Sequence, residues 1–436
     1  MGGVSMPYYL HEGLTTGANT GIDQINAYKT LEDAQAGTPD GETLLCFAPN
    51  GKLITSALGG FTNSNIVAIG VDSNFASDAP FVIDGQNTSV NIILCNNTSA
   101  RRLYRNFVFK RATGDGLLGT GTNGLGFLLL ENCVIELCGG YGINGTTFTN
   151  AAYGYSKVDK SIIRNCGNYA IRGLFQGEII NSMICANYGG VYIDKAGTLI
   201  DNCVIAYSTT GAGILIGAGG NRPTIVNSII DSNTAGITMQ VASSLVLNDS
   251  KVTRNTVGLQ FTNVLSRNYY KNNLIANNGT DIQFLGSNPT LLDMGGNITG
   301  TQNNGYRDAD NLDYRPTPAS YNRRLDKTHT MATLATKFFV SVGITSEDII
   351  YPNFNLSPNI GSVDGGTTVT LNFPDGGASL LTGVTFGGTA GTDLTIVNDN
   401  QATIETPAKA ASQVDVVGSF SGGYAAYTIT GGFTFQ

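Results

Sequence analysis

The segment Ile225-Val-Asn-Ser-Ile-Ile-Asp-Ser-Asn-Thr-Ala-Gly-Ile237 decides the fold, because the chain repeats it with variations between Leu128 and Phe284. Ser228 marks a small or polar position in the repeat. That position recurs every 21 to 28 residues, as Cys133, Ser161, Ser182, Cys203, Ser228, Ser250 and Asn273. A period in the low twenties is typical of a solenoid, whose repeats bury their apolar faces only by stacking on one another.

Three apolar columns run through these repeats. They lie three residues before the small position, two residues after it, and nine to eleven residues after it, as Ile225, Ile230 and Ile237 do in the quoted segment. Most members are β-branched, and two-residue bends separate the first two columns, which favours three short strands per coil. Abundant Gly and Asn disfavour a helical solenoid. The pattern therefore predicts an all-β chain built on a right-handed, single-stranded parallel β-helix.

The rest of the chain suggests four regions. Residues 1–40 read as an N-terminal cap with a short amphipathic helix over 22–34, and residues 41–320 as the parallel β-helix. Residues 321–354 read as a connector or C-terminal cap. Residues 355–436 alternate short strands with turns, which predicts a small β-sandwich.

Two resemblances accompany these patterns. The order of cap helix, turn, strand and Pro49-Asn-Gly51 resembles the opening of many pectate-lyase-like β-helix proteins. The series Gly365-Gly-Thr-Thr-Val-Thr370, Val384-Thr-Phe-Gly-Gly388 and Thr406-Pro-Ala408 resembles the IPT/TIG family of immunoglobulin-like domains. The second resemblance implies an Ig-like sandwich with a surface interaction role and no catalytic residues.

Charge and hydropathy exclude several classes of function. The chain of 436 residues carries a net charge of −8 and no basic run, so binding to nucleic acid is not expected. No apolar run reaches membrane-spanning length, so no membrane partner is expected. The start, Met1 to Leu10, lacks the cationic and apolar regions of a secretory signal, which favours synthesis in a cytoplasm.

Cysteine and asparagine take regular places in the repeat. The number of cysteines is odd, at 7, and Cys133 and Cys203 hold the position that Ser holds in other coils, so we expect small buried thiols. Cys138 and Cys166 share a column in adjacent coils, within reach of a disulfide. Neither a metal site nor a cofactor is expected. Asn marks two bends of each coil, the first at Asn132, Asn181, Asn202, Asn227 and Asn272 (with Lys160 and Asp249 substituting) and the second at Asn187, Asn233, Asn255 and Asn278.

Carboxylates at the first bend are the candidates for catalysis. Glu131 and Asp159 hold the same position in neighbouring coils, and Asp201 lies two coils beyond Asp159. A glycan-cleaving pair needs carboxylates several ångströms apart, and coil spacing of about 4.8 Å provides this. Acids are also common at exposed bends, which is the alternative explanation. The resemblance to pectate lyases carries no active site onto this sequence, because its acid cluster and catalytic basic residue are absent.

One outward column is unusually apolar. The residue after the small position should face solvent, yet it is apolar in six repeats: Val134, Ile162, Met183, Val204, Ile229 and Leu274. Exposed apolar stripes mark interfaces. We therefore expect side-by-side association of β-helices into a homo-oligomer, commonly a trimer. The alternative is cover by the insertion Thr146–Tyr155 or by the C-terminal segment.

Tyrosines Tyr141, Tyr169 and Tyr188 decorate the coils and could stack on sugars, although Tyr also fills half-buried strand edges. The leading expectation is a non-enzymatic structural or adhesive protein on the virion surface of a tailed phage, as capsid decoration, head spike or tail spike. Its partners would be other virion proteins and a host-surface glycan. The alternatives are a tailspike glycan depolymerase and a bacterial surface adhesin.

Overall fold

The computed structural model describes residues 6–59, 65–95, 102–119, 128–145, 155–174, 177–194, 197–217, 222–240, 244–262, 267–285, 290–294, 297–300, 306–308, 313–316, 354–373, 378, 381–398, 401–420 and 426–436. The chain divides into two units, Met1–Gly343 and Ile344–Gln436.

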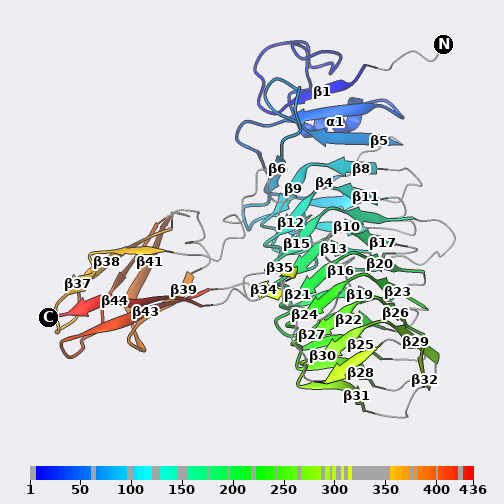
Figure 1. Ribbon diagram of the computed structural model, residues 1–436. Coiled ribbons are helices and arrows are strands. Elements are labelled where there is room, and N and C mark those ends of the chain that lie inside the picture. Colours follow the sequence, from blue (N-terminus) through cyan, green and yellow to red (C-terminus); the bar gives the residue numbers. More distant parts are fainter. Residues whose placement is uncertain are drawn as a thin grey trace. The chain divides into compact units, whose positions relative to one another are not determined.

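The first unit is a parallel β-helix, in which three sheets run along one axis (Figure 1). Sheet A comprises β1 (Tyr8–His11), β2 (Thr43–Phe47), β5 (Ile66–Gly70), β8 (Arg102–Arg105), β11 (Leu128–Glu131), β14 (Lys157–Asp159), β17 (Glu178–Ile180), β20 (Leu199–Asp201), β23 (Thr224–Val226), β26 (Val246–Asn248), β29 (Arg267–Lys271) and β32 (Thr290–Asp293). Sheet B comprises β3 (Lys52–Leu53), β6 (Phe81–Asp84), β9 (Phe107–Lys110), β12 (Val134–Glu136), β15 (Ile162–Arg164), β18 (Met183–Cys185), β21 (Val204–Ala206), β24 (Ile229–Asp231), β27 (Lys251–Thr253), β30 (Leu274–Ala276) and β33 (Ile298–Gly300).

Sheet C comprises β4 (Leu58–Gly59), β7 (Ile93–Cys95), β10 (Leu117–Gly119), β13 (Ile143–Asn144), β16 (Tyr169–Arg172), β19 (Gly189–Ile193), β22 (Ala212–Ile216), β25 (Ala235–Met239), β28 (Val257–Phe261) and β31 (Thr280–Phe284). A separate antiparallel pair joins β34 (Tyr306–Asp308) to β35 (Asp313–Pro316).

The strand register places similar residues next to one another in successive coils. Ile200 pairs with Ile225 in sheet A, and Ile205 pairs with Ile230 in sheet B. These side chains belong to one continuous apolar core between the sheets. The predicted parallel β-helix and its three inward columns are therefore confirmed. Each fully buried aliphatic side chain stabilises such a core by roughly 1.5–3 kcal/mol.

The first bend, between sheets A and B, uses the left-handed backbone conformation. Its residues are Asn132, Lys160, Asn181, Asn202, Asn227, Asp249 and Asn272, with φ between 48° and 55°. Asn adopts this conformation at low cost because its short side chain hydrogen-bonds locally. The predicted role of this column is confirmed.

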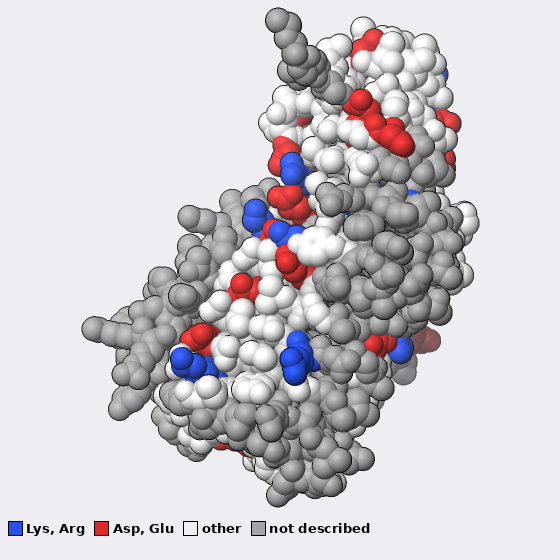
Figure 2. All heavy atoms as spheres, turned by 90° about the vertical axis from the view of Figure 1, so that its right-hand side faces the viewer, with Lys and Arg blue, Asp and Glu red and all other residues white. Residues whose placement is uncertain are grey.

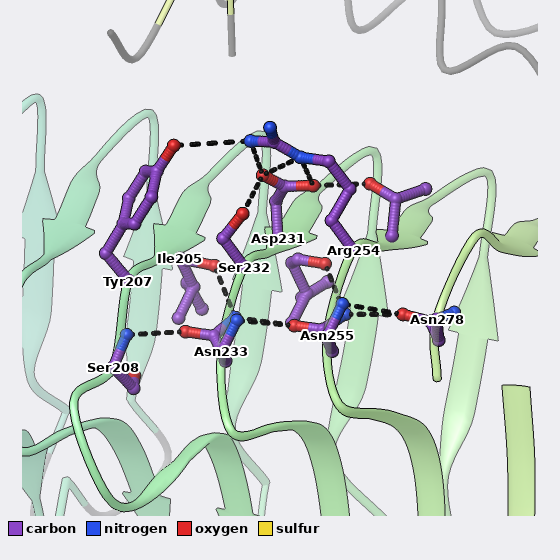
Figure 3. Close-up of polar contacts among 11 residues, drawn as sticks. Ile205, Tyr207, Ser208, Asp231, Ser232, Asn233, Arg254, Asn255 and Asn278 are labelled. Carbon is purple, nitrogen blue, oxygen red and sulfur yellow. Dashed lines mark hydrogen bonds and ion pairs between the residues drawn. The ribbon is translucent and has the colours of Figure 1, made fainter. Parts of the chain in front are cut away.

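The second Asn column does not itself adopt the bend conformation. The residue before each Asn has the positive φ, for example Ser232 and Arg254. The Asn side chains point into the coil, where Asn187, Asn233 and Asn255 are buried and Asn278 is partly buried. Asn233 Nδ2 donates to Asn255 Oδ1 at 3.0 Å, and Asn255 Nδ2 donates to Asn278 Oδ1 at 3.0 Å (Figure 3). This column is a buried hydrogen-bonded ladder.

The N-terminal cap differs from the expected helix over 22–34. The helix α1 spans only Leu31–Gly37, because Thr30 caps its N-terminus by accepting from the backbone N–H of Asp33. Ile22, the first residue of the expected helix, and Ile25, an apolar residue of its expected i, i+3 pattern, are both exposed. The first strand, β1, already pairs in parallel with β2. The prediction of a helix starting at Ile22 was therefore wrong.

The second unit contains two sheets. One orders β36 (Asn355–Ser357), β38 (Thr368–Asn372), β42 (Gln401–Glu405) and β41 (Thr392–Asn398). The other orders β37 (Ile360–Gly361), β44 (Tyr427–Phe435), β43 (Ser412–Phe420), β39 (Leu381–Phe386) and β40 (Thr389–Ala390). Phe354, Phe386 and Phe433 belong to its separate apolar core. Its membership of the IPT/TIG family stays a prediction. The predicted connector, 321–354, lies outside the described residues except for Phe354.

The cysteines of the β-helix are free and buried wherever their side chains are described, Cys138 and Cys166 included. Burial raises the pKa of Cys133 and of Cys203 to about 12. Both thiols therefore stay protonated in the folded protein at pH values where an exposed thiol ionises.

This burial predicts a loss of stability in alkali. Above pH 9 the unfolded chain releases thiol protons that the folded chain retains, so each thiol lowers stability by about 1.4 kcal/mol per pH unit until the folded pKa is reached. Urea unfolding at pH 8 and pH 10 should show this fall. The double variant Cys133→Ser/Cys203→Ser should lose about 3 kcal/mol less over the same interval, because Ser occupies that position in other coils. An equal fall in both proteins would contradict the prediction.

Candidate functional site: a groove on the outer face of sheet C

The outer face of sheet C carries a groove that runs along the β-helix over β16 to β28. Its cavity has a volume of about 380 Å³. Aromatic, aliphatic and small residues form its floor: Tyr169, Ala212, Leu215, Ala235 and Val257. Hydroxyl and amide side chains complete the lining: Thr210, Thr234, Thr238, Gln240, Thr256 and Gln260.

Strand register explains how the floor forms. Ala212, Ala235 and Val257 stand opposite one another in consecutive strands, so three small side chains follow in a row. The next outward row runs from Leu215 to Thr238 and then to Gln260. Small residues beside larger ones leave the first row recessed, and the recess becomes the groove.

Glycines allow the ring of Tyr169 to lie across the following coils. A Cβ atom on Gly189 would approach a carbon of the Tyr169 ring to 2.4 Å, and one on Gly211 would lie 3.0 Å from its hydroxyl. The ring also meets Tyr188 and Tyr192, at centroid distances of 5.8 Å and 5.5 Å. Burial raises the pKa of Tyr169 to about 12, so its phenol stays neutral.

A polar cluster adjoins this aromatic end of the groove. The Arg172 guanidinium lies 4.5 Å from the centroid of the Tyr192 ring and donates to Tyr141 Oη at 3.0 Å. It also forms an ion pair with Asp194 at 3.2 Å. Burial opposes the charge of Arg172, but Tyr141 and Asp194 outweigh it and raise its pKa above the usual value. The other carboxylate oxygen of Asp194, Oδ1, is buried and has no partner among the described residues.

The structure thus brings the predicted tyrosines Tyr141, Tyr169 and Tyr188 together at one end of the groove. Tyr188 is 40% exposed, whereas Tyr169 is largely buried. The sequence prediction missed the row of Thr, Ala and Gln residues that continues the groove. The sequence signal that could have predicted this row is a small residue, such as Ala212 or Ala235, that recurs on the outward side of the third strand in successive coils.

The predicted carboxylates lie on a different face. Glu131 and Asp159 are register partners in sheet A, and Asp201 follows two strands later. Glu131 pairs with Arg105 at 2.8 Å, and Asp159 pairs with Lys157 at 3.2 Å. Figure 2 shows this face, where described acidic and basic side chains are interspersed across the middle. Coil spacing places the first two acids together as expected, but not in the groove. Catalysis by them stays a prediction.

The outward apolar column is not exposed. Val134, Ile162, Met183, Val204, Ile229 and Leu274 are only 1% to 6% exposed within the single chain. The prediction of an exposed stripe was therefore wrong. The cover expected from Thr146–Tyr155 or from the C-terminal segment lies largely outside the described residues and stays a prediction. Association of copies stays a prediction, without an exposed stripe to support it.

The same face of sheet B buries an ion pair that the sequence analysis missed. The Asp231 side chain is 0% exposed and pairs with Arg254 at 2.6 Å (Figure 3). Thr253 Oγ1 donates to it at 2.6 Å and Ser232 Oγ at 3.0 Å, while Arg254 also donates to Tyr207 Oη at 3.2 Å. Asp231 and Thr253 are fully buried in this cluster and Arg254 is 23% exposed, which suits a structural role.

The described part of the chain contains neither a candidate metal cluster nor a candidate membrane-spanning helix. No group of three or more His, Cys, Asp and Glu side chains there is placed to hold a metal ion. No helix among these residues is long and apolar enough to span a membrane.

Comparison with known proteins adds a likeness of fold. Residues 173–305 match the family model of a right-handed β-helix region. The crystal structure of pectate lyase Pel9A is similar over 75% of this chain and 88% of its own, with 13% identity and a TM-score of 0.45. The catalytic unit of a GH87 α-1,3-glucanase from Streptomyces thermodiastaticus is similar over 62% and 67%, with 14% identity and a TM-score of 0.37.

A mannuronic acid specific polysaccharide family 6 lyase from human gut microbiota is similar over 60% of this chain and 76% of its own, with 10% identity and a TM-score of 0.27. No curated protein matches this chain. At these identities and TM-scores, the three likenesses carry no argument about activity or substrate.

Proposed function

We propose that this chain binds a polysaccharide in the groove on the outer face of sheet C. The observation that carries the proposal is the continuous row of recessed small residues, which Tyr169 closes at one end and which hydroxyl and amide side chains border. The groove follows the axis of the β-helix, so it repeats at a spacing of about 4.8 Å per coil. A long polymer with a repeating structure suits such a site.

The chemistry of the lining supports a sugar ligand. Sugars present apolar C–H faces and hydroxyl groups on one molecule, so they need an aromatic or aliphatic surface together with donors and acceptors. The tyrosines and Leu215 provide the apolar surface, and side chains such as Thr238 and Gln260 provide the hydrogen-bond donors and acceptors. The stacked coils supply a rigid backbone beneath both, which limits the entropy lost on binding.

Substitution of an exposed tyrosine tests this proposal. Tyr188→Ala should weaken binding to a retained polysaccharide by about ten-fold, because it removes an exposed ring that meets Tyr169. The matched control is Tyr269→Ala, since Tyr269 is comparably exposed but lies on β29 of sheet A. Isothermal titration calorimetry on polysaccharides selected by glycan-array screening measures both. Equal affinity of the two variants would place binding elsewhere.

Glycan cleavage is the second candidate, and Asp194 is the observation that favours it. A carboxylate beside a glycan groove is the group that acid–base cleavage requires, and its Oδ1 atom is buried without a partner among the described residues. Size-exclusion chromatography of a bound polysaccharide after incubation distinguishes the candidates. Shortened chains that disappear with Asp194→Asn would support a depolymerase, and unchanged chains would support adhesion alone.

An adhesive role at the surface of a tailed-phage virion is compatible with glycan binding. That location, the other virion proteins as partners and a trimeric state remain proposals. Mass spectrometry of purified virions tests the location, and absence of this chain from the particles would contradict it.

A further inference from the structure

We propose that the groove takes a neutral polysaccharide and discriminates against polymers that carry uronate or sulfate groups. This inference rests on the proposed glycan-binding function and names the class of its ligand. It follows from three features of the groove: the absence of charge in its lining, the neutralisation of the adjacent cation, and a row of groups that both donate and accept hydrogen bonds.

No Lys, Arg, Asp or Glu occurs among the described residues that line the groove. A carboxylate or sulfate that enters such a site loses hydration and meets no opposite charge in return, which costs several kcal/mol. Proteins that bind polyanions offset this loss with Arg or Lys at hydrogen-bonding distance. The net charge of −8 adds a long-range repulsion toward a polyanion.

The cation beside the groove is already engaged. Arg172 pairs with the Asp194 carboxylate at 3.2 Å, donates to Tyr141 at 3.0 Å and lies over the Tyr192 ring. An incoming anion would have to compete with a carboxylate that the fold holds in place. Arg172 therefore acts as a positioning residue for the Tyr192 and Tyr141 rings in this proposal, and it supplies no net positive charge.

The outward row of sheet C supplies neutral partners instead. Thr238 Oγ1 donates to Gln260 Oε1 at 3.4 Å, and Gln260 Nε2 donates to Gln283 Oε1 at 2.9 Å. These residues lie in consecutive strands, so one neutral polar group follows another at each coil. Hydroxyl and amide groups both donate and accept. Sugar hydroxyls do the same, whereas a carboxylate only accepts.

Affinity gel electrophoresis of the full chain tests the inference. The gels contain neutral polymers (dextran, laminarin, yeast mannan) or anionic ones (polygalacturonate, alginate, dextran sulfate), each at low and high ionic strength. At least one neutral polymer should retard the wild-type chain equally at both ionic strengths, because no ion pair contributes. The anionic polymers should not retard it.

Two variants connect the retardation to the groove. Gln260→Ala should weaken retention by the neutral polymer about ten-fold, because it removes the amide that links Thr238 to Gln283. Tyr269→Ala on sheet A should leave retention unchanged. Neutral binding that Gln260→Ala does not affect would overturn the assignment to this groove.

The outcomes separate the two proposals. Retention by an anionic polymer that decreases with salt and with Tyr188→Ala would overturn the neutral class and leave glycan binding in the groove standing. Failure of every polymer to retard the chain would overturn glycan binding itself, and the neutral class with it.

Discussion

Asp231→Ala is expected to lower the free energy of unfolding by about 3–5 kcal/mol. The carboxylate is fully buried, and it accepts from Arg254, Thr253 and Ser232. Removing it leaves the Arg254 charge and the buried Thr253 hydroxyl without these contacts on a covered face of sheet B. Removal of one member of a buried, hydrogen-bonded ion pair is costly because the other loses its compensation. Urea unfolding followed by circular dichroism measures the change.

Glu131→Ala is the matched control for Asp231→Ala. Glu131 also pairs with an arginine, Arg105, at 2.8 Å, but its side chain is 31% exposed. Solvent screens that pair, so we expect a change below about 1 kcal/mol. Losses of equal size in the two variants would contradict the view that burial, and not the ion pair alone, gives Asp231 its effect.

Asn255→Ala is expected to lower the free energy of unfolding by about 3–5 kcal/mol. Asn255 Oδ1 accepts from both the backbone N–H and the side-chain amide of Asn233, and its Nδ2 donates to the Ile230 carbonyl at 3.1 Å. Ala removes these partners from groups that lie inside the coil. Each buried group left unsatisfied costs about 1–3 kcal/mol.

The control for Asn255→Ala is Asn227→Gly, in the first Asn column. Asn227 has a φ of 50°, which Gly adopts freely, and its side chain makes a half-buried hydrogen bond to Asp201 at 2.8 Å. Its loss should change stability by about 1 kcal/mol or less. Chemical denaturation of both variants in parallel provides the test. A larger loss for Asn227→Gly would show that the outer column, and not the inner ladder, holds the coils together.

The two Asn columns show where sequence reasoning stops. Both recur at the repeat period, and the sequence assigned both to bends. The left-handed backbone at Asn227 agrees with this, but Asn255 follows the left-handed residue and points inward. Moving a residue by one position along a strand turns its side chain from one face of the sheet to the other. The repeat period alone does not specify that shift.

The site shows the same division. The sequence identified tyrosines Tyr141, Tyr169 and Tyr188, which lie at the groove. It also proposed the acids Glu131 and Asp159, because the repeat does not indicate which of the three sheets carries the groove. The groove depends on small side chains such as Ala212 and Ala235 lying in register. A recess is defined by side chains that are short beside longer ones, and a residue-by-residue pattern does not describe it.

The sequence by itself determined the parallel β-helix, because a repeat in the low twenties with three apolar columns buries its faces only by stacking. It also determined the left-handed bends and the buried thiols. Only the tertiary structure decided which outward surfaces remain open. The apolar column from Val134 to Leu274 looked exposed from alternation alone, yet its side chains are buried in the folded chain. Strand alternation assigns a side chain to one side of its own sheet, whereas exposure depends on segments distant in the sequence that pack against that side.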